Sequence, residues 1–439
     1  MRIFVAWNAP AKKMRVSVTP PVQLRGRVAL PSSKSLSNRA LTLCALAGGG
    51  SELVENLSEC DDTRVMRQWL SGDGAHVDIG AAGTAMRFST ALLAVTPGEH
   101  LITGSERMCH RPISLLVEAL RQLGAHIDYV GEEGYPPLRI IGRQGLSGGR
   151  LSLQGSVSSQ YVSALLMIAP TLRQGLQLRL EGEIISRPYI DMTLSLMRAF
   201  GAQAAWTDGQ TLSVEPVPYQ RRAFFVESDW SAASYWYSFL ALSEDAGACV
   251  ELPGLFRPSL QGDSRVAELF RPLGVATAYE AWGVRLTKAA AEGKHEGLPA
   301  GGQTEPPMEV DLVAQPDLAQ TLVVACCLKG IPFRFSGLQS LRIKETDRLA
   351  ALRTELSKIG FPVEEREGRQ LCWDGRRTEP QRAAAIDTYD DHRMAMAFAP
   401  CALATGSVCI NNPHVVSKSY PRFWADLGAM GFGITFSAL

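Results

Sequence analysis

The sequence predicts an α/β protein of two lobes, each built from three copies of one β-α-β-α-β-β unit. One observation is a helix of small and apolar residues that recurs after polar loops. Its six predicted starts lie near Ser35, Thr84, Ser159, Ser231, Leu318 and Arg393. A second observation is a glycine that follows each start by 38 to 43 residues and ends another apolar run. Spacing this regular over six copies indicates an internal repeat.

Each copy carries the same elements in the same order. The first helix is followed by a strand and a second helix, which ends at one of six glycines. These are Gly74, Gly124, Gly201, Gly274, Gly360 and Gly431. Glycine readily adopts the left-handed conformation that stops a helix, and alternating runs such as residues 138–141 then predict a strand pair. Only ten residues separate Gly74 from Thr84, so the first copy is expected to lack one hairpin.

The sixth copy is incomplete, because only eight residues follow Gly431. Strand patterns near residues 15–18 and 22–30 belong to no helix and are expected to complete it. The chain would then begin in the lobe in which it ends. The predicted lobes are residues 33–227 and, discontinuously, residues 14–32 plus 228–439. Residues 1–13 have no apolar core of signal-peptide length, and we interpret them as a disordered extension or a misassigned start.

The composition argues against several classes of protein. Of 439 residues, 46% are hydrophobic and 20% are charged, with 44 basic against 44 acidic, which favours neither disorder nor a nucleic-acid surface. Every apolar run is far shorter than the roughly 20 residues of a membrane-spanning helix. Nine cysteines, an odd number without a C-x-x-C pair, argue against a complete disulfide framework. We therefore expect a cytoplasmic protein with no membrane or nucleic-acid partner. We also expect it to be a monomer that acts on small molecules.

Polar loops that precede the buried helices of the first half carry cations and hydroxyls. A Pro-Ser-Ser-Lys-Ser motif places Lys34, Ser35 and Arg39 in the first helical turns, where a helix N-terminus attracts anions. A Gly-Thr pair at 83–84 and the three serines and glutamine of 156–160 repeat this arrangement. A helix cap with solvated charges, or turn chemistry, would explain the first two motifs as well. A cap needs only one serine, so the third motif is harder to explain in that way.

The second half supplies the remaining charge. It contains Asp317 before a buried helix, a Lys-Glu-Thr-Asp-Arg run at 344–348, an Asp-Asp-His-Arg run at 390–393 and an isolated Lys418. The first run could be a solvated face laced by ion pairs one turn apart, and the histidine could be a satisfied core residue. Since no metal-ligand spacing, nucleotide fingerprint or nucleophile elbow is visible, neither a metal nor a cofactor is expected. Together these groups predict a cationic cleft between the lobes that binds two anionic substrates and performs acid-base chemistry.

Nine motifs in order, between residues 28 and 428, closely resemble those of the 5-enolpyruvylshikimate-3-phosphate (EPSP) synthase family. They are LPSSKSLSNR at 30–39, AGTAMR at 82–87, RM and RP within 107–112, YPPLR at 135–139, GSVSSQ at 155–160, SRPYID at 186–191, PD at 316–317, KETDR at 344–348 and DHRMA at 391–395. The resemblance implies a two-lobed inverse α/β barrel. It also implies a transferase of the shikimate pathway, which leads to chorismate and the aromatic amino acids. The implied reaction moves the enolpyruvyl group of phosphoenolpyruvate to the 5-hydroxyl of shikimate 3-phosphate and releases phosphate.

The resemblance also implies roles for individual residues, by their position in the motifs. The implied catalytic residues are Lys34, Asp317 and Glu345. The implied shikimate 3-phosphate contacts are Lys34, Ser35, Arg39, Ser158, Ser159, Gln160, Ser186, Tyr189, Asp317 and Lys344. The implied phosphoenolpyruvate contacts are Lys34, Gly83, Arg111, Gln160, Glu345, Arg348, His392, Arg393 and Lys418. Four positions depart from the family pattern, which has Gly, Asn, Pro and Asn where this chain has Ser32, Ala81, Phe88 and Ser340.

Two other interpretations stay open at this point. The enolpyruvyl transferases of cell-wall synthesis resemble this protein in their repeat architecture but use a reactive cysteine. Cys109 lies near the corresponding loop, although its neighbours match the shikimate motif. A non-catalytic two-lobed binding descendant would fit the shortened first copy, but binding alone would not require both Asp317 and Glu345. Phosphate release in the presence of both substrates would distinguish these interpretations.

Overall fold

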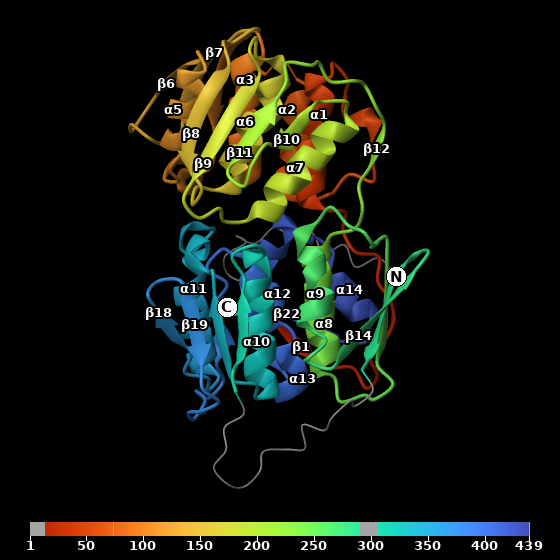
Figure 1. Cartoon of the computed structure of the whole chain (residues 1–439). Coiled ribbons are helices and arrows are strands. Elements are labelled where there is room, and N and C mark those ends of the chain that lie inside the picture. The colour runs from red at the N-terminus through yellow and green to blue at the C-terminus, as the bar shows by residue number, and fades with distance from the viewer. Residues whose placement is uncertain (1–13, 73, 290–305, 439) are drawn as a thin grey trace. The chain divides into compact units, whose positions relative to one another are not determined.

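The computed structural model describes residues 14–72, 74–289 and 306–438 (Figure 1). By its internal contacts the chain divides into two compact units. The N-terminal unit comprises Ser32–Asp229 with Leu260–Gly262. The C-terminal unit comprises the described residues of Met1–Pro31, Trp230–Ser259 and Asp263–Leu439. The predicted extension at residues 1–13 lies outside the described residues.

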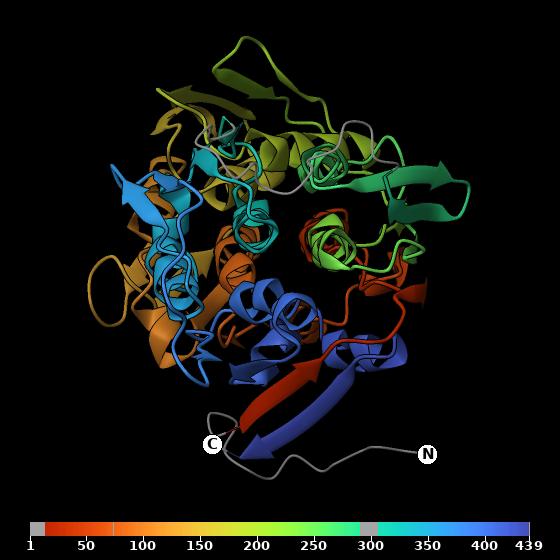
Figure 2. The same ribbon diagram turned by 90° about the horizontal axis from the view of Figure 1, so that it is seen from below.

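Each unit contains three buried helices that contact one another. They are α1 (Lys34–Leu46), α3 (Gly83–Val95) and α6 (Ser159–Ile168) in the N-terminal unit, and α8 (Trp230–Leu242), α10 (Ala319–Lys329) and α12 (His392–Phe398) in the C-terminal unit. Each begins within one residue of its predicted start, so these six predictions are confirmed. Buried residues occupy all faces of these helices, as expected for helices that pack against neighbours on every side. Figure 2 shows α8, α10 and α12 seen along their axes, with strands outside them.

The second helix of each copy lies closer to the surface. These helices are α2 (Asp61–Leu70), α5 (Ser114–Gln122), α7 (Arg187–Ala199), α9 (Val266–Leu269), α11 (Arg348–Lys358) and α14 (Phe423–Ala429), with short additional helices α4 (Glu106–Cys109) and α13 (Cys401–Thr405). The six predicted glycines follow these helices with φ between 69° and 99°. This is the left-handed region in which glycine alone is unstrained, so the predicted helix stops are confirmed.

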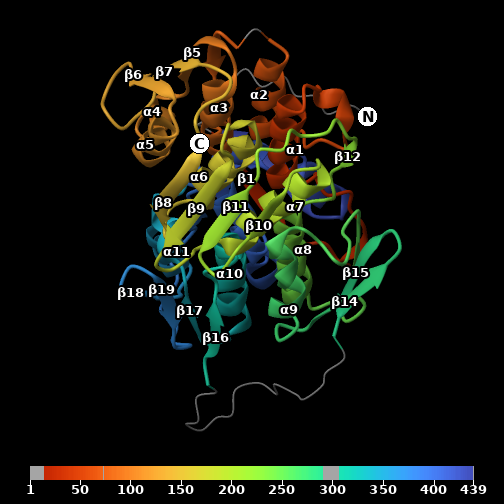
Figure 3. The same cartoon turned by 45° about the horizontal axis from the view of Figure 1, so that its top comes forward.

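Five sheets among the described residues have four strands and one shared topology, in which a parallel pair is extended by two antiparallel strands. In spatial order they are β4 (His76–Asp78), β5 (Gly98–Thr103), β7 (Leu138–Gly142), β6 (His126–Tyr129); β8 (Gly149–Gln154), β9 (Leu176–Glu181), β11 (Thr211–Val214), β10 (Ala204–Trp206); β2 (Arg25–Arg27), β13 (Cys249–Pro253), β15 (Gly283–Lys288), β14 (Val275–Glu280); β16 (Met308–Asp311), β17 (Phe333–Ser336), β19 (Gln370–Trp373), β18 (Glu364–Arg366); and β20 (Ala385–Ile386), β21 (Val408–Asn411), β1 (Met14–Thr19), β22 (Gly433–Ala438). Figure 3 shows the second of these sheets face on.

The first copy has only a two-stranded sheet, formed by β3 (Val54–Glu55) and β12 (Phe224–Phe225). This sheet consists of a parallel pair alone, so the antiparallel hairpin of the other copies is missing. The shortened first copy predicted from the spacing of Gly74 and Thr84 is therefore confirmed.

The two N-terminal strands join different sheets. β1 completes the sixth sheet as expected, with Val16 opposite both Ile410 and Phe436. The expectation that the second strand would join it is wrong, because β2 pairs with β13 in the sheet of the fourth copy. Pro20 and Pro21 separate the two strands, and since proline cannot donate to a ladder, the chain leaves the first sheet there.

Candidate active site

The polar residues predicted in the first half gather at the N-termini of α1, α3 and α6. Ser33 caps α1 by accepting the backbone N–H of Leu36 (3.4 Å), and Ser158 caps α6 by accepting that of Gln160 (3.3 Å). The Gln160 side chain then donates to Thr84 Oγ1 (3.1 Å), which joins α6 to α3. Three helix N-termini thus bring hydroxyls and backbone donors together in one unit, an arrangement suited to anions.

Arg39 links the helices of this region through its hydrogen bonds. Its guanidinium is buried and donates to Thr193 Oγ1 (2.7 Å), Ser163 Oγ (3.1 Å) and the backbone carbonyl of Ser35 (2.9 Å). A fourth bond, 3.3 Å long, reaches the carbonyl of Tyr189 on α7. Burial lowers the pKa of Arg39 to about 10, which still leaves the group charged at neutral pH. The side chain therefore fixes the positions of its neighbours at the predicted shikimate 3-phosphate site.

Lys34 begins α1 and faces an acid that the motif analysis missed. Its Nζ lies 3.9 Å from Oδ2 of Asp62, a buried residue of α2. The backbone N–H of Lys34 donates to Asp229 Oδ2 (3.4 Å). The only sequence signal for Asp62 was its place in a double aspartate at the start of a helix.

Gly83 gives Arg111 room to approach α3. A Cβ at position 83 would lie 2.7 Å from Nη1 of Arg111, closer than side-chain carbons approach. The neighbouring Arg87 is buried and donates to the carbonyls of Gly83 (3.2 Å) and Pro112 (3.2 Å). The loop that carries Arg111 is thus held against the start of α3, and Arg111 and Gly83, two of the implied phosphoenolpyruvate contacts, lie close together.

Ser186 and Tyr189 lie at the start of α7, which contacts α1 and α6. Ser186 has a left-handed backbone (φ 55°), which is uncommon for a residue other than glycine. The carbonyl of Tyr189 accepts from Thr193 Oγ1 (2.9 Å) as well as from Arg39. The structure therefore places these two predicted residues in the same unit and beside the same helices as Lys34 and Ser35.

A second polar cluster, in the C-terminal unit, is built around Arg348. Asp347 caps α11 by accepting two backbone N–H groups at 3.1 Å, so that Arg348 is the first residue of the helix. The Arg348 guanidinium contacts three carboxylates at once: Asp391 Oδ2 (2.7 Å), Glu345 Oε2 (2.9 Å) and Asp317 Oδ1 (3.0 Å). Burial would lower the pKa of Arg348, but the carboxylates, Asp391 foremost, hold it above its ordinary value.

Asp317 is bound by cations on several sides. Arg393 Nη2 lies 2.9 Å from its Oδ2, and Lys344 Nζ lies 3.8 Å from the Oδ1 that Arg348 also contacts. Burial alone would raise the pKa of Asp317, but Arg393, Lys344 and Arg348 together hold it well below its ordinary value. The carboxylate is therefore ionised at neutral pH and can act as a hydrogen-bond acceptor.

The remaining predicted residues complete this cluster. Glu345 Oε1 lies 3.2 Å from Lys418 Nζ. His392 and Arg393 open α12, which is capped by Asp391 through the backbone N–H of Arg393 (2.9 Å). Sequence reasoning placed Asp391 at the helix start but did not assign it as the fully buried partner of Arg348. Among residues 14–72, 74–289 and 306–438 no group of His, Cys, Asp and Glu could hold a metal ion.

Comparison with known proteins decides the family. A family model described as EPSP synthase (3-phosphoshikimate 1-carboxyvinyltransferase) matches residues 18–76 and 67–427. The chain belongs to the EPSP synthase family. The resemblance inferred from its motifs is confirmed.

Relatives within the EPSP synthase family match nearly the whole chain. A 3-phosphoshikimate 1-carboxyvinyltransferase of Bacteroides fragilis is 55% identical over 421 residues, which cover 96% of this chain and 99% of the relative. A protein of the same name from Ralstonia pickettii is 39% identical, with coverages of 94% and 99%.

Two solved structures support the fold. EPSP synthase from Acinetobacter baumannii superimposes with a TM-score of 0.75 at 21% identity, covering 97% of this chain and all of the other. An enolpyruvyl transferase from Streptomyces tendae gives a TM-score of 0.68 at 15% identity, covering 98% and 100%. At such identities the likeness concerns the fold alone, which is the predicted two-lobed inverse α/β barrel.

Proposed function

We propose that the chain transfers the enolpyruvyl group of phosphoenolpyruvate to the 5-hydroxyl of shikimate 3-phosphate and releases phosphate. The observation that carries the proposal is the pair of carboxylates, Asp317 and Glu345, held by one buried guanidinium and flanked by two lysines. Membership of the EPSP synthase family and the relative at 55% identity support the same reaction.

Each substrate is assigned the residues implied by the motifs. Shikimate 3-phosphate binds Lys34, Ser35, Arg39, Ser158, Ser159, Gln160, Ser186, Tyr189, Asp317 and Lys344. Phosphoenolpyruvate binds Lys34, Gly83, Arg111, Gln160, Glu345, Arg348, His392, Arg393 and Lys418. The arginines suit carboxylate and phosphate because a planar guanidinium can form two parallel hydrogen bonds. In this proposal the two lobes that supply these residues are residues 33–227 and, discontinuously, residues 14–32 plus 228–439.

The reaction needs three proton movements. The methylene carbon of phosphoenolpyruvate gains a proton while the 5-hydroxyl loses one and attacks the adjacent carbon. The tetrahedral intermediate then loses a proton from its methyl carbon and expels phosphate, which restores the double bond. We assign the proton exchange at this carbon and at the leaving group to Glu345 and Lys34, and the orientation or deprotonation of the hydroxyl to Asp317, which its cationic neighbours keep ionised.

We place this activity in the cytoplasm, in a monomer that acts on small molecules and not on nucleic acid. All nine cysteines are free thiols, which suits a reducing compartment. Within the described parts of the chain, no helix combines the length and apolar character required to cross a bilayer.

The test is phosphate release by Glu345→Gln in the presence of both substrates. Loss of a general acid-base group is expected to lower kcat by about 10²–10⁴-fold, while binding of shikimate 3-phosphate, followed by tryptophan fluorescence, is retained. The matched control is Glu365→Gln, because Glu365 pairs with Arg353 (3.1 Å) and with Arg342 (3.6 Å) rather than with a proposed substrate ligand.

Near-full turnover of Glu345→Gln would remove Glu345 from the mechanism. A wild-type protein that binds shikimate 3-phosphate without releasing phosphate would favour the non-catalytic interpretation. Turnover with a nucleotide sugar in place of shikimate 3-phosphate would favour the transferase of cell-wall synthesis.

A further inference from the structure

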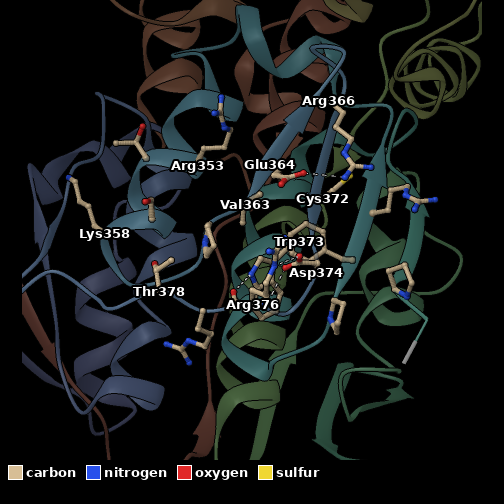
Figure 4. Close-up of a pocket in the computed structure, with 18 of the residues that line it drawn as sticks. Arg353, Lys358, Val363, Glu364, Arg366, Cys372, Trp373, Asp374, Arg376 and Thr378 are labelled. Atoms are coloured by element: carbon tan, nitrogen blue, oxygen red, sulfur yellow. Dashed lines mark hydrogen bonds and ion pairs between the residues drawn. The ribbon is translucent and has the colours of Figure 1, made fainter. Parts of the chain in front are cut away.

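A large cavity opens in the C-terminal unit along one side of α11. Its volume is about 1050 Å³, and its walls come from α11, β17, β18, β19 and the loop after β19 (Figure 4). The residues of α11 that line the cavity are Ala350, Arg353, Thr354, Ser357 and Lys358, on one side of the helix, whereas Arg348, the centre of the proposed catalytic cluster, is buried. Neither Arg348 nor its partners Asp317, Glu345 and Asp391 line the cavity. The cavity is therefore separate from the catalytic cluster.

The lining carries an excess of positive charge. Its acidic members are Glu364 and Asp374, and its six basic members are Arg334, Arg353, Lys358, Arg366, Arg376 and Arg377. Five of the six also have a carboxylate partner within or just outside the lining, so the charge that is not balanced locally is that of Arg377. This unbalanced cation favours an anionic occupant.

Most of these cations already have a carboxylate neighbour. Arg366 contacts Glu364 (3.1 Å) and Arg376 contacts Asp374 (2.6 Å), as the dashed lines in Figure 4 show. Arg334, Arg353 and Lys358 pair with acids that do not line the cavity. Apart from the pair of Lys358 with the buried Glu355, these are exposed pairs, which typically contribute about 0–1 kcal/mol. A guanidinium has five donors, so such an arginine can also bind a ligand.

Arg377 is the exception. Its guanidinium carbon lies 4.1 Å from the centre of the Phe361 ring. No carboxylate pairs with it in the part of the chain that the structure describes. Stacking holds the group in place and leaves its donors available to a ligand. A guanidinium held in this way is well suited to phosphate or carboxylate.

The cavity also has an apolar portion, formed by Pro332, Phe333, Val363 and Trp373. The indole N–H of Trp373 donates to the backbone carbonyl of Arg376 (2.8 Å). This bond fixes the loop that carries Arg376 and Arg377 against the sheet. Arginines are thus held beside an apolar surface, which suits a ligand with both an anionic and an apolar part.

We propose that this cavity binds an organic polyanion: a small molecule that carries two or more phosphate groups on an apolar or aromatic body. The arginines, Arg377 foremost, select the phosphates and the apolar surface selects the body. A volume of about 1050 Å³ exceeds what a free inorganic phosphate requires and is in the range of pockets that bind drug-sized ligands. The site is additional to the proposed activity and does not depend on it.

The test measures binding of ATP, without metal ion, to the full chain by calorimetry. Saturable binding is expected, with pyrophosphate weaker than ATP and adenosine weaker still. Arg377→Ala should lower the affinity for ATP at least about tenfold, the effect of losing one charge-assisted contact, and should leave kcat/KM for phosphoenolpyruvate unchanged. The matched control is Arg27→Ala, because Arg27 also stacks on an aromatic ring (Trp282, 5.1 Å) but lies outside the cavity.

Unchanged ATP affinity in Arg377→Ala would overturn the proposal, because ATP would then occupy another site. Adenosine that binds as tightly as ATP would overturn the role of charge, and pyrophosphate that binds as tightly would overturn the role of the apolar surface. If Arg377→Ala does not fold, Arg376→Ala provides the same test, because that side chain is 80% exposed and its loss does not disturb the core.

Discussion

Replacing Arg348 by methionine should strongly destabilise the C-terminal unit. The change removes a guanidinium whose side chain is 2% exposed and leaves Asp391 (0% exposed), Asp317 and Glu345 without their shared partner. Removing one partner of a buried ion pair typically costs about 3–5 kcal/mol. We expect the free energy of unfolding of this unit to fall by that amount at pH 7.

The pH dependence gives the prediction a second, independent test. In the wild type the pKa of Asp317 is held below its ordinary value, so Asp317 contributes stability above about pH 4 and loses it as the pH falls through the lowered pKa. Without Arg348 this lowering is weaker, and the crowded carboxylates can take up protons as the solution becomes acidic. The stability difference between wild type and variant should therefore be largest at neutral pH and narrow below about pH 4.

The matched control is Arg353→Met on the same helix. Arg353 is 46% exposed and pairs with Glu365 (3.1 Å), so its loss should change stability by about 0–1 kcal/mol. Urea unfolding followed by intrinsic fluorescence reports on this unit, because it contains the buried Trp230 and Trp236. Equal midpoints for the two variants, or a difference that does not change with pH, would refute the assignment of Arg348 as the centre of a buried ion cluster.

Three further outcomes follow from single contacts. Gly83→Ala should raise KM for phosphoenolpyruvate in steady-state kinetics by about 10–10²-fold, because the new Cβ would displace the guanidinium of Arg111 and misplacement by about 1 Å can have that effect. Arg39→Lys should lower the free energy of unfolding of the N-terminal unit in urea by about 1–3 kcal/mol, because a lysine cannot satisfy the same buried oxygens. Burial lowers the pKa of Lys288 to about 8, so the unfolded chain binds more protons between pH 8 and 10, and wild-type stability should rise over that range. In Lys288→Met the rise of the melting temperature with pH should be smaller, and the part that remains comes from Lys329, whose pKa burial also lowers.

The repeat could be predicted from the sequence because its signals are local. A buried helix must be apolar over consecutive turns, and a helix that stops in the left-handed conformation favours glycine, so both features are visible in short windows. Strand partners carry no such signal. β2 and β12 are only three and two residues long, and each joins the sheet of a copy remote in sequence. β2 precedes the first copy but pairs with β13 of the fourth, and β12 precedes the fourth copy but pairs with β3 of the first. Such long-range pairing is not encoded in the periodicity of the sequence.

The candidate site, like the fold, could be predicted from the sequence only in part. The residue types and their motifs identified Asp317, Glu345 and Arg348 as members of a charged cluster. The sequence did not reveal that Asp391, 43 residues further on, supplies the most buried carboxylate to Arg348. Nor did it reveal that Asp62 faces Lys34. Side-chain pairs of this kind are set by the packing of helices from different copies, so they become visible only once the fold is known.

The repeat also explains why the polar groups lie where they do. Since the first helix of each copy is buried on all its faces, only its N-terminal end can present polar groups without breaking the core. Five copies supply predicted site residues at or near that end. The fourth copy supplies no predicted site residue, but it too carries a polar group there. Its α8 carries Ser231, which donates to Asp263 and accepts a 3.5 Å bond from Arg393, a predicted phosphoenolpyruvate ligand. All six copies therefore place polar groups at the same point of the unit, the start of the buried first helix.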